Sequence, residues 1–117
     1  MAAARRDFFL TVQHGQFYQG KPVIGYDLPG FGDELCGLPY LPRLIAKARA
    51  KLVGSMGDDI IYCCENDRRF FRDHGNIHPA DFLRVVWAAG DSDPKVYDYV
   101  RQRTLSVSSA VPDNEQT

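Results

Sequence analysis

The side chains best suited to bind an anion lie in one basic run. Arg43, Lys47 and Lys51 follow one another at intervals of four residues, and Arg49 flanks them. On a helix this spacing forms one basic ridge, which could join Arg68, Arg69 and Arg72 in one patch for phosphates. Contacts of arginine and lysine to phosphate supply most non-specific affinity for nucleic acids. No glutamate balances the ridge at the same spacing. We favour a solvated helix face, because no stacking platform or nucleic-acid-recognition motif accompanies the ridge.

A set of thiol and imidazole side chains lies further along the chain, at Cys63, Cys64, His74 and His78. The two histidines have a zinc-finger-like spacing, but adjacent cysteines rarely point at one ion. Glycine follows the first histidine and proline the second, so no single helix carries both histidines on one face. We therefore expect no metal and no other cofactor, with the cysteines packed as small apolar groups.

Acidic residues cluster at Asp58, Asp59 and Glu65, where a catalytic acid or base would be sought. Catalysis needs such a group within hydrogen-bond reach of a partner that orients it, and this spacing does not provide one. The sequence contains no nucleophile elbow, phosphate-binding loop or dinucleotide fingerprint. An enzyme of unknown class is therefore the weaker alternative, and we assign no catalytic residue.

Aromatic side chains are the remaining candidates, because tryptophan and tyrosine are common anchors of protein interfaces. We weigh Trp87 equally as an interface residue and as core, whereas Phe70, Phe82 and Tyr99 are expected in the core. The candidate binding residues are thus Arg43, Lys47, Arg49, Lys51 and Trp87.

The basic ridge needs a helix to position it, and residues 41–53 predict one. Apolar side chains recur at helical spacing on one side, at Leu41, Leu44, Ile45, Ala48 and Leu52. Pro42 suits the first turn, where no amide hydrogen is needed, and Gly54 suits a left-handed C-terminal cap. The cations of the ridge are expected on the opposite side of this helix.

Three further helices are indicated by paired start and stop signals. The signals are Asn66 before Asp67, His78 before Pro79, and Asp93 before Pro94, with Gly75 and Gly90 as stops. An aspartate, asparagine or similar cap followed by proline suits the first helical turn. Residues 106–117 are small and polar, so we expect a disordered tail there.

The N-terminal residues differ in character, with large apolar side chains that include Phe8, Leu10 and Val12 in alternation. They predict either a β-hairpin docked on the helices or an apolar arm that packs on them. Residues 27–39 are rich in glycine and proline and predict a loop. The expected organisation is an arm or hairpin over residues 1–26, a helical domain over 27–105 and a tail over 106–117.

A chain of 117 residues has room for one hydrophobic core. We predict a mostly α, single compact domain of four or five short helices; the alternative is α+β, if residues 8–26 form a true hairpin. The net charge of -1 gives no overall attraction to nucleic acid or anionic membrane, and no apolar run is long enough to span a bilayer. The three cysteines lack the spacing of a disulfide framework, which favours a cytoplasmic protein.

The run Leu-Pro-Arg-Leu-Ile-Ala-Lys-Ala-Arg-Ala-Lys-Leu-Val-Gly at residues 41–54 resembles the signature helix of a small bacterial family. That family is known as domain of unknown function fifty-sixty-nine. Its later segments are similar to residues 67–71, 77–86 and 99–101, so the resemblance covers residues 27–103. Residues 1–26 have no counterpart, and Gly57-Asp58-Asp59 stands where the family often has Gly-Glu-Tyr. The resemblance implies a compact helical domain and implies no activity.

These observations favour a small cytoplasmic, non-catalytic interaction or adaptor module that binds a protein partner or forms a homodimer. The alternative is a protein that binds nucleic acid or a phosphate-bearing ligand through the basic ridge. Of these partners nucleic acid is not favoured, and no membrane association is expected.

Overall fold

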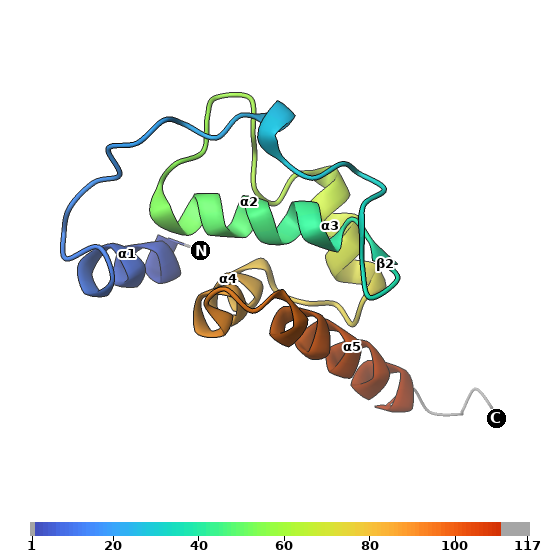
Figure 1. Cartoon of the computed structure of the whole chain (residues 1–117). Helices are drawn as coiled ribbons and strands as arrows, with labels where there is room; N and C mark the ends of the chain where they lie inside the picture. The colour runs from blue at the N-terminus through green and yellow to red at the C-terminus, as the bar shows by residue number, and fades with distance from the viewer. Residues whose placement is uncertain (1, 111–117) are drawn as a thin grey trace.

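The computed structural model describes residues 2–110. Within that range the chain forms five α-helices, one short 3-10 helix and one small hairpin (Figure 1). The elements in order are α1 (Ala2–Thr11), η1 (Gly25–Asp27), β1 (Glu34–Leu35), β2 (Leu38–Pro39), α2 (Leu41–Val53), α3 (Glu65–Asp73), α4 (Pro79–Ala89) and α5 (Asp93–Ala110). The mostly α fold with a small hairpin is therefore confirmed.

Helix α2 lies at the centre of the fold and contacts α1, α4 and α5 (Figure 1). Its predicted apolar side chains are almost fully buried: Leu41, Leu44, Ile45, Ala48 and Leu52. Pro42 occupies the first turn, and Gly54 ends the helix at φ 84°, with its N–H donating to the carbonyl of Ala50. The sequence thus predicts this helix, both of its ends and its buried side.

The N-terminal residues form a helix where the sequence suggested a strand or arm. Helix α1 places Ala4 and Phe8 on one face, four residues apart, and this face packs against α2 and α4. Leu10 and Val12 remain exposed. The alternation of apolar residues therefore gave the wrong prediction of a strand. On a helix, residues four apart share a face, and this brings Ala4 and Phe8 to the core.

The N-terminal residues also complete the C-terminal end of α2, where backbone carbonyls lack partners within the helix. The Arg5 Nε–H donates to the Lys51 carbonyl over 3.2 Å, and the Gln13 side-chain amide donates to the Val53 carbonyl over 2.9 Å. After α1 the chain runs across α2 toward the opposite end of that helix (Figure 1).

The small hairpin lies at residues 34–39 and not within residues 8–26. Glu34 pairs with Pro39 and Leu35 with Leu38 in antiparallel register. Cys36 and Gly37 make the turn with φ values of 53° and 84°. Two-residue hairpin turns require such positive φ values, but cysteine is an unusual residue at the first position, so the sequence predicted only a loop.

The helix entries after α2 follow the predicted signals with two differences. Helix α3 begins at Glu65 with Cys64 as its N-cap, so Asn66 lies inside the first turn. Helix α5 continues to Ala110, past the predicted start of a tail at Ser106, and residues 111–117 of that predicted tail lie outside the described residues. Between residues 2 and 110, none of the helices has the length and apolar character needed to cross a membrane.

Candidate functional sites

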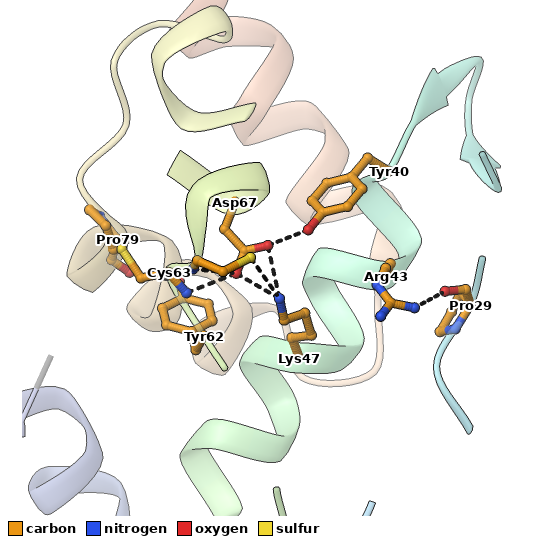
Figure 2. A network of polar contacts seen from close by, with 9 residues as sticks. Pro29, Tyr40, Arg43, Lys47, Tyr62, Cys63, Asp67 and Pro79 are labelled. Atoms are coloured by element: carbon orange, nitrogen blue, oxygen red, sulfur yellow. Dashed lines mark hydrogen bonds and ion pairs between the residues drawn. The ribbon is translucent and has the colours of Figure 1, made fainter. Parts of the chain in front are cut away.

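A buried ion pair joins α2 to α3. The Lys47 Nζ lies 2.9 Å from the Asp67 Oδ2, and the side chains are 5% and 0% exposed (Figure 2). The prediction that Lys47 lies on a solvated basic ridge was therefore wrong. The segment that leads into α3 covers this side of α2, and Asp67 supplies the countercharge that a buried ammonium group requires.

The carboxylate of Asp67 is satisfied by several donors besides Lys47 (Figure 2). The Tyr40 hydroxyl donates to Oδ1 over 2.5 Å, and the Cys63 backbone N–H donates to Oδ2 over 2.8 Å. Burial, and then the hydrogen bond to Asp67, raises the pKa of Tyr40. Burial likewise raises the pKa of Tyr62, whose hydroxyl donates to the Pro79 carbonyl over 2.9 Å. Because the polar groups of Lys47, Asp67 and Tyr40 satisfy one another's hydrogen bonds, this network links α2 to α3.

The other members of the predicted ridge point to different places. The Arg43 Nη1 donates to the Pro29 carbonyl over 3.0 Å (Figure 2). Its guanidinium lies 4.2 Å from the centre of the Phe31 ring. The Arg49 Nη2 forms a 2.6 Å ion pair with Asp93. Since Lys47 is buried as well, the residues do not form one basic surface.

The two remaining candidates lie near the N-terminal helix. Lys51 is half-buried beside Arg5, which donates to its carbonyl. Trp87 is also half-buried, and its ring meets that of Phe8 edge-on at 5.3 Å between centroids. Trp87 and Arg49 line one pocket of about 220 Å³, while Lys51 lines another. The five predicted residues are thus spread over three separate places.

The cysteines and histidines do not converge. No group of three or more metal-ligating side chains occurs among the residues that the structure describes. The His78 Nδ1 accepts the Ala80 backbone N–H over 3.1 Å and so caps α4. The Cys64 Sγ lies 3.5 Å from the Lys47 Nζ, and burial raises the pKa of the Cys63 thiol.

Three exposed apolar side chains, Ile24, Tyr26 and Ile61, lie on two loops that are bonded to each other, and we call this region the loop surface. Their exposed fractions are 43%, 93% and 66%. Two loops are joined here, since the Gly25 N–H donates to the Asp59 carboxylate over 2.9 Å. A short bridge between residues 23 and 56 ties the same loops together, with backbone bonds of 2.6 and 2.7 Å. The loop surface is therefore held in place by bonds between distant segments.

A second feature is a pocket of about 230 Å³ between α3 and the hairpin region, which we call the ring pocket. It is lined by Phe31, Tyr40, Asn66, Arg69, Phe70, Asp73 and His74. Four of these form a row of aromatic rings, with successive centroids 5.8, 6.1 and 4.1 Å apart from residue 31 to residue 74. The remaining three supply an amide, a guanidinium and a carboxylate.

Sequence reasoning missed both features, for different reasons. The residues of the ring pocket on α3 recur at the spacing of one helical face, and that face is visible in the sequence at residues 66, 69, 70, 73 and 74. The rings of Phe31 and Tyr40 join them only through the tertiary fold. The loop surface leaves no local signal, because its residues come from segments 35 positions apart, at 26 and 61.

Of three comparisons with known proteins, one found a match, and that match is to a family model. A search of curated proteins and a search of solved structures each found no match. The model of the family described as "Domain of unknown function (DUF5069)" matches residues 32–111. This range includes the hairpin and α2 to α5, and it leaves out α1 and most of the loop that follows. The chain therefore belongs to the DUF5069 family.

Proposed function

We propose that this DUF5069 member is a non-catalytic interaction module that binds a partner protein through the loop surface. The observation that carries this proposal is Tyr26, a large aromatic side chain that is 93% exposed on a segment fixed by tertiary bonds. Tyrosine is enriched among the residues that dominate binding energy at interfaces. Ile24 and Ile61 extend its apolar area, and leaving such side chains in water forgoes roughly 1.5–3 kcal/mol each.

The charge around the loop surface indicates the chemistry of the partner. Asp27 follows Tyr26 in the chain, Asp58 and Asp59 shortly precede Ile61, and all three aspartates are exposed. Complementary charges favour association and like charges oppose it. We therefore expect a partner that presents an apolar side chain flanked by lysine or arginine. A second copy of the chain is disfavoured on this surface, because a symmetric pair would bring the same aspartates together.

Binding of nucleic acid or phosphate by the predicted basic ridge has less support. Lys47 is buried against Asp67, and Arg49 is paired with Asp93. Counterion release scales with the number of free cations that contact phosphate. A ridge reduced to Arg43 and Lys51 therefore offers weak electrostatic attraction.

The experiment compares wild-type protein with a Tyr26→Ser/Ile61→Ser variant as bait in a cell extract. A Phe17→Ser/Leu10→Ser variant is the control, since these side chains are also exposed and apolar but lie on the N-terminal segment. A partner captured by wild type and control is then purified and titrated against all three proteins. We expect the loop-surface variant to bind at least about 10-fold more weakly, as befits loss of interface anchors.

Three results would contradict the proposal. The first is equal affinity of the loop-surface variant for the purified partner. The second is a partner lost only by the control variant. The third is a wild-type protein that captures nothing specific and self-associates through the loop surface when its mass is measured in solution.

A further inference from the structure

We infer that the ring pocket binds a mononucleotide, with the base against the aromatic row and the phosphate on Arg69. This site shares no residue with the loop surface, and the inference is independent of the proposed partner. It begins from the rings of Phe31, Tyr40, Phe70 and His74, which gather from a loop, the start of α2 and two turns of α3.

The four rings differ in their exposure to solvent. Phe70 is buried and forms the floor, Tyr40 and His74 are half-buried, and Phe31 is exposed at the rim. The His74 ring is stacked on Phe70 at 4.1 Å with an interplanar angle of 27°. A flat heterocycle gains from stacking on such a wall, and every base has a suitable face. Phe31 lies at the rim, where its ring also meets the Arg43 guanidinium at 4.2 Å.

The polar groups of the pocket match the rest of a nucleotide. Arg68 and Arg72 are both engaged by Glu65, whereas no ion pair of Arg69 occurs among the described residues. Arg69 is therefore the α3 arginine available for a phosphate. Asn66 offers amide N–H donors about one turn before Arg69, and Asp73 offers acceptors for ribose hydroxyls.

Imidazole geometry adds one more contact for the ligand. The His74 Nδ1 donates to the Phe70 carbonyl over 2.8 Å, so the Nε2 of the neutral ring is left as an acceptor. The Tyr40 hydroxyl, by contrast, is committed to Asp67. The base is thus read by His74, while Tyr40 contributes its ring.

The size of the pocket limits the ligand to one nucleotide. Its volume of about 230 Å³ is below the ~300–1,000 Å³ typical of sites that enclose a whole drug-sized ligand. A single nucleotide would therefore lie partly outside the pocket, and a dinucleotide would exceed it further. A single arginine beside one aspartate also provides less positive charge than a polyphosphate chain requires.

The test titrates the full-length protein with AMP, adenosine and ribose 5-phosphate, using isothermal calorimetry and ligand-observed NMR. AMP should bind saturably, adenosine more weakly, and ribose 5-phosphate weakest because it lacks the base. Phe31→Ala should weaken AMP by about 5- to 150-fold, the range for loss of one base-stacking side chain. Arg69→Gln should weaken AMP while leaving adenosine unchanged. Arg72→Gln is the matched control and should change neither.

The substituted side chains are exposed, so the variants keep the fold, and circular dichroism of each verifies this. The inference is overturned if AMP, GMP, CMP and UMP all fail to bind the wild-type protein saturably. Equal affinity for ribose 5-phosphate and AMP would also overturn it, since the rings would then play no part. So would an equal loss of AMP binding in Arg72→Gln and Arg69→Gln, or binding of single-stranded oligonucleotides without binding of mononucleotides.

Discussion

Lys47 of α2 and Asp67 of α3 form an ion pair of 2.9 Å from which solvent is excluded. The pair fixes the start of α3 against the middle of α2, and Tyr40 and Cys63 complete the bonding of the carboxylate. It thereby positions both proposed sites, since the segment before α3 carries Ile61 of the loop surface and α3 itself carries Arg69 of the ring pocket.

Loss of Asp67 should therefore destabilise the whole domain. Asp67→Ala leaves the Lys47 ammonium group buried without a counterion, and we expect the free energy of unfolding to fall by about 3–5 kcal/mol. Urea denaturation monitored by circular dichroism measures this change. Asp93→Ala removes the exposed ion pair of Arg49 and should cost at most about 1 kcal/mol. A similar fall in the free energy of unfolding for both variants would show that the buried ion pair contributes no more to stability than the ion pair of Arg49 and Asp93.

Leu44 tests the packing of the central helix. Its side chain is fully buried in the middle of the apolar side of α2. Leu44→Ala should lower the free energy of unfolding by about 2–5 kcal/mol, because the surrounding helices cannot close the cavity completely. Leu105→Ala, at a half-exposed position on α5, serves as the control and should cost clearly less. A cost below about 1 kcal/mol for Leu44→Ala would contradict the packing described.

The N-terminal residues should prove part of the folded domain, although the family match does not include them. Ala4 is fully buried against the core, and Arg5 and Gln13 bond the last carbonyls of α2. Deleting residues 1–26 should lower the melting temperature and expose apolar surface. Ala4→Glu should reproduce part of that loss by forcing a charge into the contact. If the deletion leaves the melting temperature and the oligomeric state unchanged, the segment is an accessory arm and does not complete the core.

Alkaline pH should destabilise the protein through its buried tyrosines. The pKa values of Tyr40 and Tyr62 are raised in the folded state, chiefly by burial, whereas an unfolded tyrosine titrates near ~10. Above that value the unfolded chain loses protons that the folded chain keeps, so the free energy of unfolding falls as pH rises. Urea melts between about pH 8 and pH 11 measure the slope. The Tyr40→Phe/Tyr62→Phe variant should show a smaller dependence of the free energy of unfolding on pH. An unaltered slope would mean that other groups cause the loss of stability.

The sequence predicted the parts of this fold that rest on local signals. Pro42 and Gly54 mark the ends of α2, and His78 caps α4 as its position before a proline suggested. The same reasoning failed for Lys47, because its burial depends on Asp67, twenty residues away in the sequence. Helical spacing alone puts a lysine on one side of a helix and cannot show what covers that side.

The proposed sites could not be predicted for the same physical reason. Phe31 reaches the ring pocket only because the chain crosses α2 before the hairpin, a path that no local pattern encodes. Tyr26 and Ile61 are brought to neighbouring loops by contacts such as the hydrogen bond from Gly25 to Asp59, which no local pattern encodes. Only the face of α3 that carries Arg69 and His74 was visible beforehand as a helical spacing.

The most direct test of the proposed interaction is to map where the captured partner binds. Isotope-labelled protein is titrated with the purified partner, and backbone chemical-shift changes are followed by NMR. We expect the largest changes at residues 23–28 and 57–62, with α5 little affected. Changes centred on α1 or α5, with the amides of Tyr26 and Ile61 unmoved, would contradict the assignment of the loop surface as the interaction site.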